Sequence, residues 1–177
     1  MKAESIKEKI KDHFFINPSS KLRVREIERV LKLPLPSIIR YSKELKKEEI
    51  LTIIKIGKVV LYTSNRSSKN YLLEKKLFNI KNLYSCRLID FLAEELSNPP
   101  IIVFGSYSKG EDLENSDIDL YVETPSKKEI NLNKFENLLK RKIQVFRYKN
   151  IREIKNIHLA NNLINGIILN GFIEVFR

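Results

Sequence analysis

The hydrophobic residues in the first third of the chain recur at helical spacing and predict short helices. Ile6, Ile10 and Phe14 lie between Lys and Glu residues and predict a helix near residues 4–15. A second helix is predicted from one apolar stripe, made of Val24, Ile27, Val30 and Leu31. It should stop at residues 33–36, because the two prolines there each remove a backbone donor and disfavour helix at the preceding residue.

A third helix is expected to start near Pro36, which suits a first helical turn because its missing N–H would have no partner there. The inward positions of this helix are expected to be Ile38, Tyr41 or Ser42, and Leu45. The pattern then becomes extended, with β-rich runs at residues 50–56 and 58–63 on either side of Gly57. These runs predict a β-hairpin with a basic tip.

Three short helices followed by a two-stranded hairpin are the element order of a winged helix-turn-helix. Val24-Arg25-Glu26-Ile27 and residues 37–45 resemble the second and recognition helices of that superfamily, and the resemblance covers about residues 1–65. It implies double-stranded DNA as a partner, although some winged helices bind protein instead. A recognition helix enters the major groove, where exposed side chains reach base edges and phosphates. Arg40 is the candidate for a base contact, and the candidates for phosphate contacts are Ser37, Lys43, Lys47, Lys55 and Lys58.

Basic residues are concentrated in this same segment. Residues 1–66 hold 16 of the 33 Lys and Arg residues but only 8 of the 22 Asp and Glu residues, in a chain of net charge +11. Clustered charge favours a polyanionic partner, while a Lys-rich solvated surface would account for it equally well.

Residues 67–96 return to helical spacing and predict a helical linker, either one long helix or two helices joined near Asn82. Such a segment can pack against a neighbouring domain or pair with a second copy. A homodimer would suit a DNA-binding protein, because half-site recognition uses two-fold symmetry. The sequence leaves these alternatives open.

The residues that carry chemistry follow Pro99-Pro100. Residues 101–104 predict a short buried strand that ends in Gly105-Ser106, and residues 116–122 predict a strand with alternating polar and apolar positions. Asp117 and Asp119 lie two apart on it, so their carboxylates project from one face with the Cα atoms about 7 Å apart. Carboxylates this close repel each other unless a cation lies between them, and Mg²⁺ favours such oxygen ligands.

Gly105 and Ser106 suit a phosphate site beside these carboxylates. A glycine lets the backbone approach a ligand closely, and Ser106 with the N–H groups that follow it can hold phosphate. A phosphate site next to a dicarboxylate metal site is the minimum for metal-assisted attack on the α-phosphate of a nucleotide.

The string from Phe104-Gly105-Ser106-Tyr107 through Gly110 to Ser116-Asp117-Ile118-Asp119-Leu120 resembles the signature of the DNA polymerase β nucleotidyltransferase superfamily, in its minimal nucleotidyltransferase branch. The resemblance covers about residues 85–177. It implies ATP or another NTP as substrate, and Mg²⁺ held by Asp117 and Asp119 as catalytic residues. The nucleotide contacts that it implies are Gly105, Ser106, Lys109 and Ser116. Minimal members often work beside a small helical protein in toxin–antitoxin pairs, so the resemblance also implies such a partner as a candidate.

In that family a small mixed sheet is backed by helices, and the remaining segments can supply it. The pattern predicts a helix at 130–139, a strand at 142–147, a helix at 151–169, and a turn at Asn170-Gly171 into a strand at 172–176. The fold class is therefore expected to be α+β. Its parts are a winged helix at 1–66, a helical linker at 67–96 and a nucleotidyltransferase domain at 97–177.

Two positions depart from the family pattern. Catalytic members carry a third carboxylate on the strand after the paired aspartates, and the corresponding residue here is Gln144. An amide ligates a metal weakly and cannot act as a base at neutral pH. Glu123 follows Asp119 at even spacing and is a weaker substitute, because it lies far along the strand. Lys109 stands where many relatives have Arg, so it keeps the positive charge but loses the bidentate fork.

The composition also limits the kinds of protein that this sequence can encode. No apolar run approaches the roughly 18 residues of a membrane span, and the N-terminus has no apolar signal core. Cys86 is the only cysteine, so an intramolecular disulfide is excluded. These features predict a cytoplasmic protein without a membrane partner.

Two functional hypotheses remain. The first is a Mg²⁺-dependent nucleotidyltransferase with a DNA-binding winged helix, whose hydroxyl acceptor is a protein side chain, an RNA end or a small molecule. The second is a DNA-binding transcriptional regulator whose nucleotidyltransferase-fold domain is catalytically inactive because of Gln144 and binds nucleotide or a partner protein.

Overall fold

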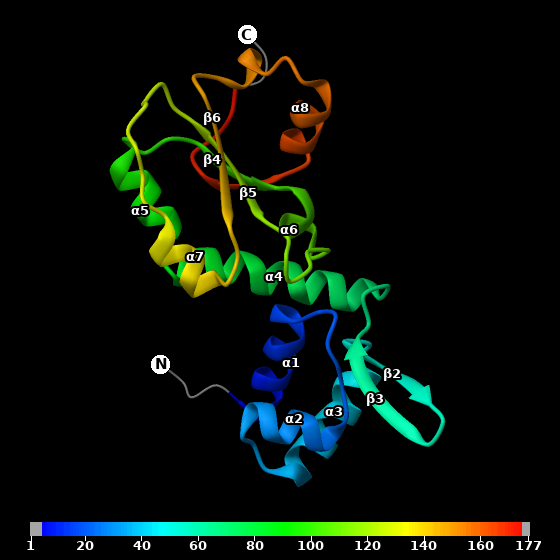
Figure 1. Ribbon diagram of the computed structural model, residues 1–177. Coiled ribbons are helices and arrows are strands. Elements are labelled where there is room, and N and C mark those ends of the chain that lie inside the picture. The colour runs from blue at the N-terminus through cyan, green and yellow to red at the C-terminus, as the bar shows by residue number, and fades with distance from the viewer. Residues whose placement is uncertain (1–4, 175–177) are drawn as a thin grey trace. The chain divides into compact units, whose positions relative to one another are not determined.

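The computed structural model describes residues 5–174 and divides into two compact units, Met1–Phe78 and Asn79–Arg177 (Figure 1). The division falls inside helix α4 (Lys69–Ser85), within the stretch that the sequence predicts as a separate linker. Each unit has its own hydrophobic core, as expected for a domain.

The first unit combines helices with a small antiparallel sheet. Its elements are α1 (Ile6–Ile16), β1 (Lys21–Leu22), α2 (Val24–Leu31), α3 (Leu35–Lys47), β2 (Leu51–Ile56), β3 (Val59–Ser64) and the first part of α4. Ser5 starts α1 through a capping box with Glu8, and Pro36 lies in the first turn of α3 as predicted. The core gathers apolar side chains from the helices and from the sheet, among them Ile10, Phe14, Ile27, Ile38, Leu45 and Tyr62.

Four details of this unit differ from the sequence prediction or refine it. Val30 is predicted in the apolar stripe of α2 but is 55% exposed. Of the two alternatives for an inward position on α3, Tyr41 and Ser42, the buried residue is Ser42. The two-residue strand β1 was not predicted, and it pairs with β3 to give the sheet order β1-β3-β2. The hairpin turn lies at Gly57, whose φ of 58° is the positive value that a two-residue hairpin turn requires at its first position.

The second unit is a four-stranded mixed sheet with helices on both faces. After the end of α4, its elements are α5 (Leu88–Glu95), β4 (Ile101–Phe104), α6 (Gly105–Lys109), β5 (Ile118–Glu123), α7 (Asn133–Leu139), β6 (Ile143–Tyr148), the 3₁₀ turn η1 (Ile151–Glu153), α8 (Ile157–Ile164) and β7 (Ile167–Asn170). The strand order is β6-β5-β4-β7, with β5 and β6 parallel and the other pairs antiparallel. One face packs on α5 and α7, and the opposite face packs on η1 and α8 (Figure 1). This α+β architecture agrees with the expected fold class.

The C-terminal segments contain the largest error of the sequence prediction. Residues 151–169 were expected to form one helix, but they form η1, α8 and then β7, which pairs with β4. Helix α8 ends at Ile164 with Asn165 as its C-cap, and the β-branched pair Ile167-Ile168 that follows Gly166 is suited to a strand. Of the strand predicted at 172–176, residues 172–174 have no regular secondary structure, and Val175 and Phe176 lie outside the described residues.

Two helix boundaries were also misplaced. The helix expected at 130–139 begins only at Asn133. The break between α4 and α5 falls at Cys86-Arg87 rather than near Asn82, because Arg87 adopts a left-handed conformation with φ of 64° and starts α5 anew.

Gly166 allows α8 to join β7 in contact with β4. A Cβ atom at this position would lie 2.5 Å from Cγ2 of Ile102 and 2.8 Å from the carbonyl oxygen of Val103. We therefore expect Gly166→Ala to lower the free energy of unfolding by about 2 kcal/mol, as measured by urea denaturation. The exposed neighbour Asn165 is the control, since Asn165→Ala removes one exposed side-chain bond and should cost less than about 1 kcal/mol. Equal stability of Gly166→Ala and the wild type would contradict this packing.

Candidate functional site

Of the two aspartates of the motif, Asp119 lies in β5 and Asp117 lies just before this strand. Asp119 is the second residue of this strand and pairs with Phe104, the last residue of β4. Gly105 follows with φ of 71°, and a Cβ atom on it would lie 2.5 Å from Oδ2 of Asp119. The Asp119 carboxylate therefore lies directly against the backbone of Gly105, where only glycine leaves room for it.

Asp117 lies close enough to Asp119 for their charges to repel each other. Partial burial raises the pKa of Asp119, and the nearby charge of Asp117 raises it further. Within residues 5–174, neither carboxylate has a hydrogen bond or ion pair that would offset this repulsion. A divalent cation would supply that missing charge, so the donor set fits Mg²⁺.

Gln144 occupies the place next to this pair. The parallel register of β5 and β6 aligns Asp119 with Gln144, and Gln144 is exposed. Residues aligned in neighbouring strands point to the same face of a sheet, so the amide lies beside the Asp119 carboxylate. In the described part of the chain, no three His, Cys, Asp or Glu side chains gather as they would around a metal ion. The acidic set at this site is therefore a pair.

Glu123 does not complete the set. Its Oε2 accepts hydrogen bonds from the Tyr121 hydroxyl, at 2.8 Å, and from the backbone N–H of Ile151, at 3.0 Å. It lies four residues beyond Asp119 on β5, or about 13 Å along the strand. Glu123 therefore anchors η1 at the opposite end of the sheet.

The remaining nucleotide candidates lie on the segment between β4 and β5. Ser106 is partly exposed in the first turn of α6, and Lys109 is exposed at its end. The Ser116 hydroxyl accepts a hydrogen bond from the N–H of Leu113 at 2.9 Å, so it shapes the loop that leads to Asp117. Gly105, Ser106 and Lys109 belong to one turn of chain that borders Asp119.

A buried polar cluster that sequence reasoning missed anchors this loop. The Asn79 side-chain amide donates to the Tyr107 carbonyl at 2.9 Å and to Oδ1 of Asp112 at 2.8 Å. Arg141 approaches Oδ2 of Asp112 at 3.6 Å, and both of these side chains are almost fully buried. The cluster ties α4, α6 and the chain before β6 to the loop, and so holds the loop that leads to the paired aspartates. Nothing local in the sequence connects these residues, because they meet only in the folded chain.

An open hollow of about 510 Å³ lies next to Asp117. Its lining is polar and charged: Glu114, Asn115, Ser116, Asp117, Glu136, Asn137, Lys140, Arg141 and Lys142. Part of this charge is already paired, because Lys142 contacts Glu136 at 2.9 Å, and Glu136 also accepts the N–H of Ile143. The N–H of Ile143 and then Lys142 lower the pKa of Glu136.

The DNA candidates all lie in the first unit. Lys43 and Lys47 are exposed on α3, Lys55 and Lys58 are exposed at the hairpin tip, and Ser37 is partly exposed near the start of α3. Arg40 is exposed but already engaged: it pairs with Glu44 at 3.5 Å, and its guanidinium lies over the Tyr41 ring at 4.3 Å.

The Gly-Ser and paired-Asp segment lies inside the part of the chain that is similar to a known family. Residues 85–169 match the family model of the nucleotidyltransferase domain, and this stretch runs from the end of α4 to β7. The match supports a general nucleotidyl-transfer function for this part of the chain. No curated protein and no solved structure matches the chain. Within the described residues, no helix is both long and apolar enough to cross a membrane.

Proposed function

We propose that the second unit is a Mg²⁺-dependent nucleotidyltransferase that takes ATP or another NTP as substrate. This proposal rests on the two neighbouring carboxylates of Asp117 and Asp119, which have no counter-charge among residues 5–174 and lie beside the backbone of Gly105. Two like charges without a protein counter-charge are costly to keep together, and a divalent cation held by these two carboxylates would offset that cost.

In the proposed reaction, the acceptor hydroxyl oxygen forms a bond to the α-phosphorus of the NTP. The bond from this phosphorus to the β-phosphate breaks, pyrophosphate leaves, and the hydroxyl proton passes to water. When bound, Mg²⁺ would neutralise charge on the phosphate oxygens. Asp117 and Asp119 would hold it, Ser106 would donate to a phosphate oxygen, and Lys109 would offset charge on the triphosphate.

The residue aligned with Asp119 on the neighbouring strand, Gln144, supports a second candidate function. Gln144 cannot accept the acceptor's proton at neutral pH and contributes no charge to a second metal site. The alternative is therefore a DNA-binding regulator whose second unit binds nucleotide or a partner protein without turnover.

One assay separates the two candidates. The full chain is incubated with Mg²⁺ and each α-labelled NTP, together with acceptors of each class: protein, RNA and small molecule. Label that moves to an acceptor, and only with Mg²⁺ present, supports the transferase. Nucleotide that binds in equilibrium dialysis without any transfer under these conditions contradicts the transferase and favours the regulator.

We further propose that the first unit is a winged helix that binds double-stranded DNA. The proposal is supported by the exposed basic side chains of α3, Lys43 and Lys47, and by Lys55 and Lys58 at the hairpin tip. Lysines placed in this way would contact phosphates and position the helix in the major groove.

Reversing two of these charges should weaken DNA binding. We expect Arg40→Glu combined with Lys43→Glu to reduce affinity for duplex DNA by about tenfold at moderate salt, and to flatten the dependence of affinity on salt concentration. Fluorescence anisotropy at several salt concentrations measures both effects. The matched control is Lys9→Glu with Arg66→Glu, which reverses the same charge types at exposed positions on α1 and after β3. If both double variants bind DNA alike, α3 is not the DNA-binding surface.

A further inference from the structure

Strand β6 presents a row of side chains that begins beside the paired aspartates. Alternate residues of a strand point to the same face, so Gln144, Phe146 and Tyr148 share the face on which Asp119 lies. Successive members of this row are about 7 Å apart along the strand. β6 is an edge strand of its sheet, and Phe146 and Tyr148 are only partly buried.

The two rings of this row are held in place from the protein side. The Phe146 ring packs on Phe104 with the ring centroids 5.4 Å apart, and the Tyr148 ring stacks on Tyr121 at 6.2 Å with 23° between the ring planes. Phe104 and Tyr121 are buried, so they fix the orientation of the outer rings. The outer rings thus form a partly exposed aromatic surface that packs on buried rings.

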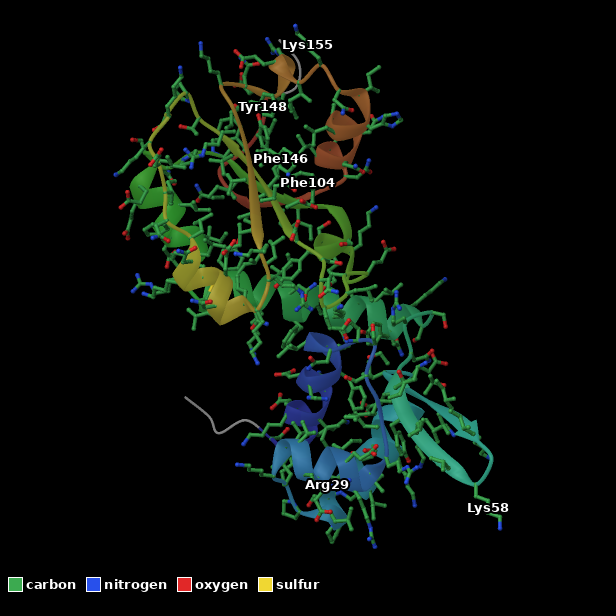
Figure 2. All side chains as sticks on the ribbon, in the orientation of Figure 1. Arg29, Lys58, Phe104, Phe146, Tyr148 and Lys155 are labelled. Atoms are coloured by element: carbon green, nitrogen blue, oxygen red, sulfur yellow. The ribbon has the colours of Figure 1, made fainter. Side chains whose placement is uncertain are left out.

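A basic segment continues from the end of this row. Residues 147–155 contain four basic residues and one acidic residue. Lys149, Arg152 and Lys155 are exposed, and none of them has an ion pair within residues 5–174. The segment crosses the end of the same face, because Ile151 and Ile154 pack in one cluster with the two rings. Figure 2 shows Phe146, Tyr148 and Lys155 following one another in one direction along the second unit.

We propose that Phe146, Tyr148, Lys149, Arg152 and Lys155, here called the β6 surface, bind single-stranded nucleic acid. Aromatic rings that stack on bases, next to cations that contact phosphates, are the combination that single strands require. In a duplex the bases stack on one another, so these rings would have no base to stack on. An acidic peptide would match the charge of the segment but would leave the flat rings without a partner.

The β6 surface leads to the candidate active site. A strand bound on Tyr148 and Phe146 would continue toward Gln144 and Asp119, which are aligned in adjacent strands. Its terminal hydroxyl would then be the acceptor of nucleotidyl transfer. The role of this hydroxyl as acceptor rests on the proposed function, whereas binding at the β6 surface does not.

The test uses the full chain and a short fluorescent oligouridylate. Lys149→Gln, Arg152→Gln and Lys155→Gln together should reduce affinity about tenfold and lower the salt dependence of binding. Tyr148→Leu should weaken binding severalfold, while Tyr148→Phe should retain it, because Phe keeps the stacking face. The charge-matched control is Lys81→Gln, Arg87→Gln and Lys134→Gln, which are exposed residues of the second unit outside the β6 surface. Thermal unfolding of each variant establishes that it is folded.

Photocrosslinking locates the bound strand. With 4-thiouridine in the oligonucleotide, crosslinked peptides should fall within residues 144–155. Crosslinks confined to the first unit, or equal affinity of the surface and control triple variants, would overturn the proposal.

Addition of Mg²⁺ and an α-labelled NTP then tests whether the bound oligonucleotide is the acceptor. Binding at the β6 surface without label on the oligonucleotide would leave the surface established and would count against its role as acceptor site. Label found on protein or small-molecule acceptors alone would also count against the β6 surface as acceptor site, while supporting the transferase function.

Discussion

Replacing Asp119 with Asn is expected to reduce Mg²⁺-dependent transfer of an α-labelled nucleotidyl group by at least about 100-fold. Among residues 5–174, the carboxylate is one of two acidic groups at the candidate metal site, and the charge stabilisation that a metal would provide there is worth several kcal/mol. Asn has nearly the same shape, so the contact with Gly105 is preserved while the charge is lost. Initial rates under single-turnover conditions measure the effect directly.

The control for this variant is Asp90→Asn. Asp90 is exposed on α5 and pairs only at the surface, with Arg87. Its replacement should leave the transfer rate within about twofold of the wild type, because exposed ion pairs contribute little. A fully active Asp119→Asn protein would show that the paired aspartates do not bind the catalytic metal.

The second large effect is expected in the opposite direction, from Gln144→Glu. The register of β5 and β6 places this position next to Asp119, so the change adds a carboxylate where the acidic set is incomplete. A base positioned in this way typically accelerates proton transfer by about 100-fold or more. We therefore expect transfer to rise about 100-fold, and Mg²⁺ to bind more tightly in a titration followed by calorimetry.

Gln144→Ala distinguishes the effect of an added charge from the effect of removing the Gln144 side chain. It removes the amide without adding a carboxylate, so it should not increase the rate. Gln144 is exposed, and neither variant should affect folding. If Gln144→Glu and Gln144→Ala behave alike, the missing carboxylate is not what limits this site.

The parts of the fold that the sequence predicted well depend on local pattern. The helices of the first unit, its hairpin, and the strand before Gly105 follow from apolar spacing and from proline and glycine positions. The motif is also local: Gly105 and the paired aspartates belong to one strand–loop–strand segment, and the fold brings Gly105 against Asp119. The register of β5 and β6 aligns Gln144 with Asp119, and the correspondence of Gln144 to a third carboxylate stays a prediction.

The errors occur where long-range contacts decide the structure. The apolar residues near Ile167 fit a helix as well as a buried strand, and only pairing with β4 makes this segment β7. The buried cluster of Asn79, Asp112 and Arg141 joins residues far apart in the chain, so no local pattern indicates it. Val30 belongs to the apolar stripe of α2 by its spacing but is exposed. The 3.6-residue period does not indicate which residues at the edge of a short stripe are buried.

The most direct test of the account is a structure of the protein with Mg²⁺ and a non-hydrolysable NTP. We expect the ion to contact carboxylate oxygens of Asp117 and Asp119 at about 2.1 Å, with the triphosphate beside Gly105 and Ser106. Nucleotide bound elsewhere, or aspartates turned into contacts with the protein while Mg²⁺ is in excess, would contradict the proposed active site.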